Sequence, residues 1–161
     1  MRRSEPFRRD DDGFAVKLPR EARALLASVA EHMREVLTGE TAEDDPAVAR
    51  LFPPAYPDDP MRTLEFEQVA GDDLQRDRLQ RFETLARTVD ARWVTEEQLL
   101  DWMRAINDAR IVLGVRLDMT EEMTFDDVED DPGRADAFRN YAYLSALLET
   151  IVHALGDPLE R

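Results

Sequence analysis

The chain has 161 residues, of which 43% are hydrophobic and 35% charged, a composition typical of a folded globular protein and not of a disordered one. Its formal net charge of −15 opposes nonspecific binding to nucleic acid, and the lack of cysteine excludes disulfides, thiolate metal sites and thiol-based sensing in these residues. No apolar run approaches the roughly 18 residues of a membrane span and no signal peptide is recognised, so we expect a cytoplasmic protein without a membrane partner.

Residues 5–18 predict a short β-hairpin. Alternating apolar residues flank an acidic stretch that ends in Asp12-Gly13, and Asp-Gly is typical of a tight hairpin turn. The hairpin also carries the cationic residues Arg8, Arg9 and Lys17. These cations either contact the phosphates of a nucleic acid or pair with the surplus carboxylates of the chain itself. The net charge favours the second interpretation.

Residues 19–156 predict a bundle of five or six helices. We expect them at residues 19–38, 45–51, 60–70, 72–89, 95–118 and 134–155, from the spacing of apolar residues together with proline, glycine and capping positions. Gly71 is expected to separate the third helix from the fourth, and residues 118–135 form an acidic loop. The chain is thus predicted to be a single mainly α domain over residues 1–161.

The helix that begins at Thr95, with the capping box Thr95-Glu96-Glu97-Gln98, has apolar residues on two sides. One face contains Leu99, Trp102, Ile106, Ala109, Leu113 and Leu117. The other contains Leu100, Ile111 and Val115, beside Asn107 and Arg104. Such a helix packs on both sides, either inside a bundle or between the core and a partner.

Arg110 falls within the first, apolar face of this helix. A guanidinium keeps its charge, so at a buried position it needs a carboxylate or several carbonyl partners. Asp108 is expected to pair only along its own helix, with Arg104, which leaves Arg110 to find a partner elsewhere. Arg110 is therefore either a structural salt-bridge residue or an anchor in a partner or ligand site.

The sequence contains no pattern typical of catalysis. The acidic loop lacks the EF-hand spacing, and His32 and His153 do not belong to a metal-binding motif. No serine lies in a nucleophile elbow and no glycine-rich phosphate loop is present. We therefore predict no catalytic, cofactor-binding or metal-binding residue. The alternative of a hydrolase or metal enzyme would require several carboxylates that converge in a pocket.

Two runs of residues resemble the signatures of a known family. The first signature is Arg50-Leu51-Phe52-Pro53-Pro54-Ala55-Tyr56-Pro57-Asp58-Asp59, and the second extends from Trp102 to Leu117. Both are similar to an actinobacterial family long catalogued as a domain of unknown function. The hairpin and the aromatic segment Tyr141-Ala142-Tyr143-Leu144 fit the same family, so the resemblance covers nearly the whole chain.

This family includes the AosR-type oxidative-stress regulators. The resemblance implies a cytoplasmic transcriptional regulator that works with a sigma factor. Members also tend to be encoded near the Clp protease adaptor, which fits a protein-interaction role equally well. Because the chain has no cysteine, a thiol pair cannot be its sensor, and the signal arrives by another route or through a partner.

We therefore predict a non-enzymatic regulatory protein that binds a protein partner, namely a sigma factor, other transcription machinery or Clp components. The predicted partner-binding residues are Arg110, Asn107, Arg116, Phe52 and Tyr56. The alternatives are an adaptor linked to Clp proteolysis and a DNA-binding regulator that uses Arg8, Arg9 and Lys17 of the hairpin. The strip formed by Leu100, Ile111 and Val115 also leaves a homodimer open.

Overall fold

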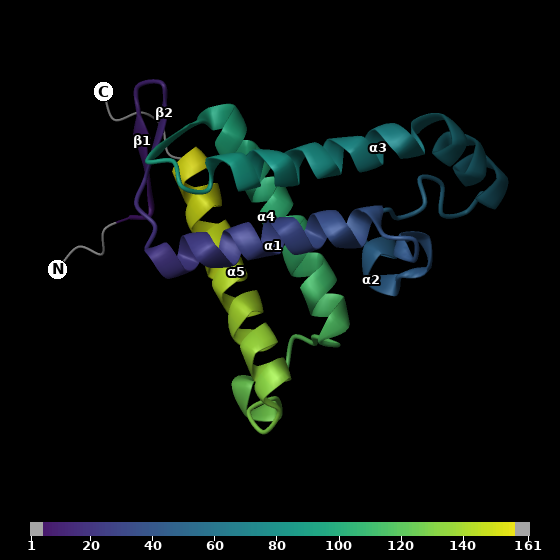
Figure 1. Ribbon diagram of the computed structural model, residues 1–161. Coiled ribbons are helices and arrows are strands. Elements are labelled where there is room, and N and C mark those ends of the chain that lie inside the picture. The colour runs from purple at the N-terminus through teal and green to yellow at the C-terminus, as the bar shows by residue number, and fades with distance from the viewer. Residues whose placement is uncertain (1–4, 157–161) are drawn as a thin grey trace.

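The computed structural model describes residues 5–156, which form five α-helices and one three-stranded antiparallel sheet (Figure 1). The helices are α1 (Arg20–Thr38), α2 (Pro46–Ala49), α3 (Pro60–Thr88), α4 (Glu96–Arg116) and α5 (Pro132–Gly156). The strands are β1 (Phe7–Asp10), β2 (Gly13–Val16) and β3 (Trp93–Thr95), and 3-10 turns lie at η1 (Ala42–Asp44) and η2 (Phe125–Asp127). The predicted mainly α fold with an N-terminal hairpin is confirmed. Within residues 5–156, no helix is both long and apolar enough to cross a bilayer.

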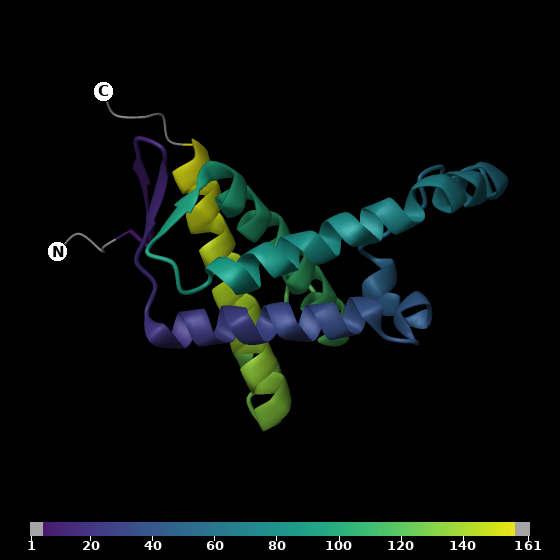
Figure 2. The ribbon, with the colours of Figure 1, turned by 45° about the horizontal axis from the view of Figure 1, so that its top comes forward.

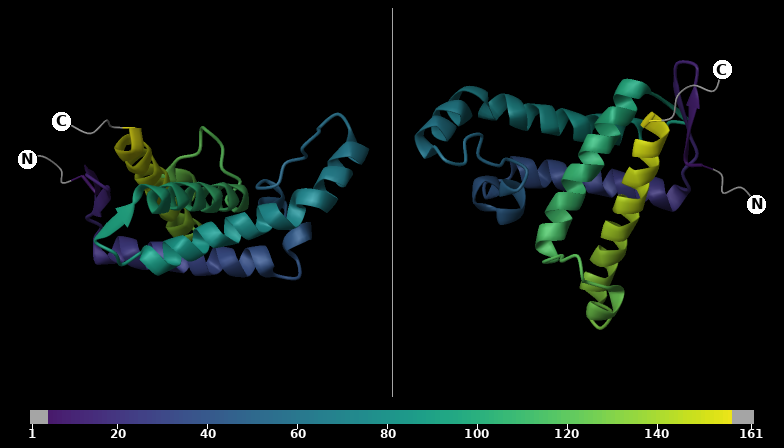
Figure 3. Two further views of the ribbon diagram at one scale, coloured as in Figure 1. Left: turned by 90° about the horizontal axis from the view of Figure 1, so that it is seen from above. Right: turned by 180° about the vertical axis from the view of Figure 1, so that it is seen from behind.

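The helices are arranged in two layers that cross steeply (Figures 2 and 3). One layer contains α1 and the C-terminal half of α3, and the other contains the antiparallel pair α4 and α5. The apolar face of α4 lies between the two layers, and its residues Leu99, Trp102 and Ile106 are fully buried. The indole Nε1 of Trp102 donates to Thr88 Oγ1 at 2.8 Å, so its polar atom is satisfied inside the core. The predicted capping box at Thr95 is confirmed, because Thr95 and Gln98 exchange both hydrogen bonds.

The sheet has the order β1-β2-β3. The hairpin β1–β2 is as predicted, and Phe14 and Val16 point into the core. The expected Asp-Gly turn is one residue out of register: Asp10 pairs with Gly13, so Gly13 lies in β2 and the turn is formed by Asp11 and Asp12. Strand β3, which pairs with β2, was not predicted, because three residues before a helix cap carry too little pattern to indicate a strand.

Helix α3 corrects the expected division at Gly71, because one continuous helix extends from Pro60 to Thr88. Glycine ends a helix efficiently when it adopts a positive φ, and Gly71 does not. Its cost inside a helix is about 1 kcal/mol, which neighbouring turns can offset. As a consequence, the N-terminal half of α3 projects beyond the end of α1 (Figure 2).

Candidate functional site

The projecting part of α3 is apolar and exposed. We call residues 58–74 the α3 arm. Seven large hydrophobic side chains are exposed within residues 5–156, and the arm contains five of them: Met61, Leu64, Phe66, Val69 and Leu74. Val69 is 84% exposed, so nothing in the described chain covers it. At 100° per residue these positions lie on several sides of the helix, an arrangement typical of a helix that another element surrounds.

The arm is also acidic. Residues 58–74 contain six carboxylates and one arginine, which gives a formal charge of −5. The single arginine, Arg62, stacks on the ring of Tyr56 at 4.3 Å, so its charge is held against the arm itself. From Gln75 onward α3 belongs to the body of the protein, because Gln75 Nε2 donates to the Leu37 carbonyl at 2.7 Å.

The first signature folds back along the arm, and Tyr56 holds it there. Thr63 Oγ1 donates to the Tyr56 carbonyl at 2.8 Å and accepts from the Tyr56 amide at 3.0 Å. The Tyr56 ring meets Phe66 edge-on, with the ring centroids 6.4 Å apart. Asp59 caps the helix by accepting from the Arg62 amide at 3.1 Å. The predicted partner-binding residue Tyr56 is therefore a structural part of the arm surface.

The two signatures meet at Arg78 of α3. Its Nη1 is 2.5 Å from Asp108 Oδ2 in the second signature, and its Nη2 donates to the Leu51 carbonyl in the first at 2.6 Å. The same guanidinium lies over the Phe52 ring, 5.0 Å from the centroid. This arrangement overturns the expectation that Asp108 pairs along its own helix. It also places Phe52, half-buried, in a structural contact with Arg78.

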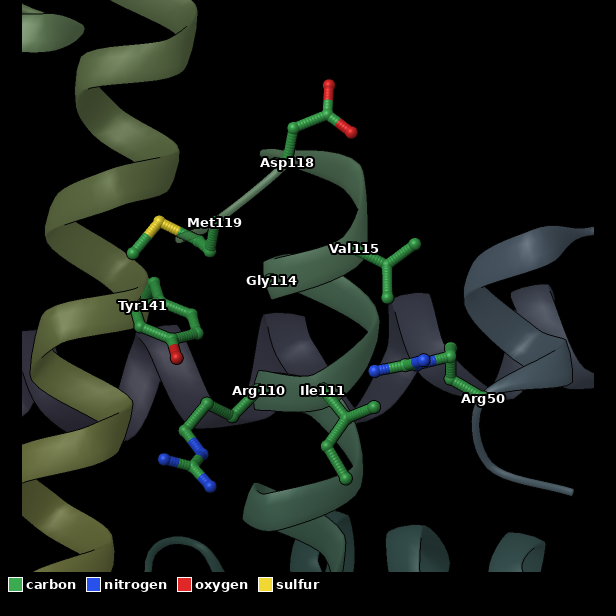
Figure 4. Close-up of a pocket in the computed structure, with 8 residues that line it drawn as sticks. All are labelled: Arg50, Arg110, Ile111, Gly114, Val115, Asp118, Met119 and Tyr141. Carbon is green, nitrogen blue, oxygen red and sulfur yellow. The ribbon is translucent and has the colours of Figure 1, made fainter. Parts of the chain in front are cut away.

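Arg110 lies on α4 at a pocket of about 320 Å³ (Figure 4), and Asn107, one turn earlier on the same helix, is its hydrogen-bond partner. We call this pocket the α4 groove; it is lined by Arg50, Arg110, Ile111, Gly114, Val115, Asp118, Met119 and Tyr141. Within residues 5–156 no carboxylate pairs with Arg110, and its Nη2 donates to the neutral Asn107 Oδ1 at 3.1 Å. The interpretation of Arg110 as a salt-bridge residue is therefore wrong for the described chain.

Arg116, at the end of α4, lies outside the groove and holds the short α2 region in place. Its Nη2 donates to Asp45 Oδ2 at 3.2 Å, and its Nη1 lies 2.9 Å from His32 Nε2 on α1. Since an arginine can only donate, His32 Nε2 is the acceptor in this pair. Asp45 is also the N-cap of α2, accepting from the Ala47 amide at 2.9 Å.

The hydrogen bond from the Ala47 amide, assisted by Arg116, lowers the pKa of Asp45 below its ordinary value. A carboxylate with a depressed folded pKa stabilises the protein above its unfolded pKa of about 3.9, and this contribution is lost as the pH falls through the folded value. We expect Asp45→Asn to lower the unfolding free energy at neutral pH, with a smaller difference from wild type at about pH 3. Urea unfolding of both proteins at the two pH values measures this.

Asp44→Asn is the control for that experiment, since Asp44 is exposed and makes no side-chain hydrogen bond to α2 within residues 5–156. A wild-type advantage over Asp45→Asn that stays constant from neutral pH to about pH 3 would contradict the assignment.

Of the basic residues of the hairpin, one makes contacts within the protein and two are exposed. Arg9 Nη1 forms an ion pair with Glu96 Oε2 at 2.8 Å, its Nη2 donates to the Leu155 carbonyl at 3.0 Å, and its guanidinium lies over Phe14. This matches the interpretation in which the hairpin pairs with the carboxylates of the chain. Arg8 and Lys17 are exposed. Two cations on a small hairpin form a weak electrostatic surface for nucleic acid.

No group of three or more His, Asp or Glu side chains in residues 5–156 is arranged to hold a metal ion. The acidic loop folds locally instead. Asp127 Oδ2 accepts from the Thr124 amide at 2.7 Å, and Asp131 Oδ1 accepts from the amides of Gly133 and Arg134 at the start of α5. These carboxylates are therefore engaged in capping turns and helix ends.

The family described as Domain of unknown function (DUF2017) matches residues 1–155. The chain belongs to the DUF2017 family. No curated protein and no solved structure matches this DUF2017 protein. The family match spans both signatures, the α3 arm and the α4 groove, so both surfaces belong to the DUF2017 domain.

The predicted site residues of this DUF2017 protein are distributed over separate places. Arg110 and Asn107 form a hydrogen bond on α4, Tyr56 lies on the arm, and Phe52 and Arg116 make contacts within the body. The sequence reading missed the arm residues, because their irregular spacing forms no single stripe. The irregular spacing could itself have indicated an exposed segment. A helix segment whose apolar residues lie on several sides cannot bury all of them against one face of its own chain.

Proposed function

We propose that this DUF2017 protein is a non-enzymatic regulator of the AosR type, which acts by docking a partner protein on the α3 arm. The observation that carries this proposal is the concentration of exposed apolar side chains on the arm. Several large apolar side chains exposed together on a projecting element are characteristic of protein–protein interaction sites. The resemblance of both signatures to the family that includes AosR-type regulators supports a sigma factor or another component of transcription as the partner.

The charge of the arm defines the chemistry of the partner. With a formal charge of −5 over residues 58–74, the arm attracts a segment that presents apolar side chains bordered by lysine or arginine. Two copies of the arm would bring like charges together, so self-association is disfavoured by the same field. An amphipathic basic helix is the partner element that satisfies both the apolar and the charged surface.

Binding of the purified protein to the sigma factors and RNA polymerase of its own cell tests the proposal. We expect Leu64→Asp and Val69→Asp each to weaken binding about tenfold or more, because each places a charge in an apolar interface. Their folding should be unchanged, since Leu64 is 49% and Val69 84% exposed. Val152→Asp on α5, where the side chain is 53% exposed, is the matched control and should bind as wild type.

Unchanged binding by both arm variants would refute the arm as the docking surface. Binding of Clp components in place of transcription proteins, with the same dependence on Leu64 and Val69, would retain the arm and replace the regulator by the adaptor. Salt-sensitive DNA binding that Arg8→Ala with Lys17→Ala abolishes would move the function to the hairpin. Sedimentation of the free protein as a dimer that Val69→Asp dissociates would assign the arm to self-association.

A further inference from the structure

The α4 groove contains a cation whose hydrogen bonds are incomplete. A guanidinium has five N–H donors, and for Arg110 the bond to Asn107 is the one present within residues 5–156. The Nε of Arg110 is buried without an acceptor, and so is the Oγ of Ser145. Ser145 lies one helical turn beyond Tyr141 on α5. Buried polar atoms are normally satisfied, so the guanidinium of Arg110 is short of acceptors within residues 5–156.

A second guanidinium enters the groove from the opposite wall. Arg50 follows α2 and points across toward Ile111 and Val115, whereas Arg110 lies on the side of α5 (Figure 4). Within residues 5–156 Arg50 has no ion pair, although the chain has 36 acidic residues against 21 lysines and arginines. Asp118 is the acidic residue among those lining the groove, and its carboxylate points away from both guanidiniums (Figure 4).

Most of the other residues that line the groove are apolar. Ile111, Val115 and Met119 line it together with the ring of Tyr141. The ring lies directly against α4 at Gly114, where a Cβ atom would approach Tyr141 Cε2 to 3.2 Å. The volume of about 320 Å³ is at the small end of the range typical of ligand pockets, so a complete occupant is a small molecule or the end of a chain.

We propose that the α4 groove binds a carboxylate carried on a short apolar chain, with Arg110 and Arg50 as its cationic partners. The planar guanidinium matches a carboxylate in shape and charge, and the apolar lining accommodates the chain behind it. The net charge of −15 disfavours a polyanion such as a nucleotide. The carboxylate belongs either to a free organic acid or to the C-terminus of a polypeptide. This proposal goes beyond partner docking on the α3 arm and does not depend on it.

Calorimetric and NMR titrations of the full chain with two probes test the proposal. Hexanoate represents a free acid, and an N-acetylated tripeptide ending in leucine represents a polypeptide C-terminus. We expect at least one acid to bind and to shift the backbone amide signals of Ile111, Gly114 and Val115. Hexanamide and the C-terminal amide of the peptide should bind about tenfold more weakly, because they lose a charge-assisted hydrogen bond. The tighter of the two acids identifies the source of the carboxylate.

Variants assign the two cations. Arg50→Ala and Arg110→Met should each weaken binding of the acid about tenfold, whereas Arg87→Ala, which removes an exposed arginine of α3 outside the groove, should not. Arg50 is exposed, so its variant should keep the fold even if Arg110→Met lowers stability. The proposal is overturned if neither acid binds, if the neutral amides bind equally well, or if Arg50→Ala binds as tightly as wild type.

Discussion

Replacing Asp108 with alanine should lower the free energy of unfolding by about 3 kcal/mol, because it removes the carboxylate that pairs with Arg78. Asp108 is 5% exposed, so the pair lies largely out of water. Without the carboxylate the guanidinium remains partly buried, held by the Leu51 carbonyl and the Phe52 ring. The loss includes this uncompensated charge as well as the missing hydrogen bond. Urea unfolding monitored by tryptophan fluorescence measures it.

Two further variants show whether the effect is that of the pair. Asp108→Asn keeps an oxygen acceptor for Arg78 and should lose less stability than Asp108→Ala. Asp101→Ala, on the same helix and without an ion pair within residues 5–156, should change stability by less than about 0.5 kcal/mol. A loss below about 1 kcal/mol in Asp108→Ala would show that water replaces the carboxylate, and that the two signatures are not joined through Arg78.

Replacing Gly13 with alanine should lower the free energy of unfolding by about 2 to 3 kcal/mol, since β2 and β3 would have to separate. A Cβ at this position would lie 2.3 Å from the Val94 carbonyl oxygen and 2.5 Å from Cζ2 of Trp93. The first of these is a backbone atom of the paired strand, which cannot move without breaking the sheet. The glycine is required by this close approach and not by its backbone conformation, because its φ is negative or extended.

Gly71→Ala is the matched control, with the opposite expected sign. Gly71 lies inside α3, and nothing lies within 4 Å of the position that a Cβ would occupy. The substitution should raise the free energy of unfolding by about 0.5 to 1 kcal/mol through helix propensity. If Gly13→Ala is as stable as wild type, the sheet accommodates a side chain at this position, and the claim that β3 lies too close to Gly13 for a Cβ atom is wrong.

Local pattern was sufficient where an element depends on its own residues. The capping box at Thr95 begins α4 as predicted, because both of its hydrogen bonds form within four residues. The apolar face with Leu99, Trp102 and Ile106 is buried as predicted, because a helix has one geometry whatever it packs against. The division expected at Gly71 failed because a glycine in a helix is an energetic cost and not a break.

The site residues depended on contacts that no local pattern contains. Asp108 was expected to pair with Arg104 on its own helix, but it is buried and pairs with Arg78, 30 residues away. The sequence singled out Arg110 as a cation on an apolar face of α4. Its neighbours in the groove, Arg50 from the end of α2 and Tyr141 from α5, are brought together by chain folding alone.

The sequence by itself determined the helical class, the presence of the hairpin, the capped start of α4 and the buried side of α4, because periodicity and capping act over a few residues. The tertiary structure decided that β3 joins the hairpin, that Arg78 links the two signatures, and that the first half of α3 leaves the body of the protein as an apolar, acidic arm. Hydrophobic spacing reports which side chains prefer to be buried. Which segment buries them, and which remain exposed, depends on the packing of distant parts of the chain.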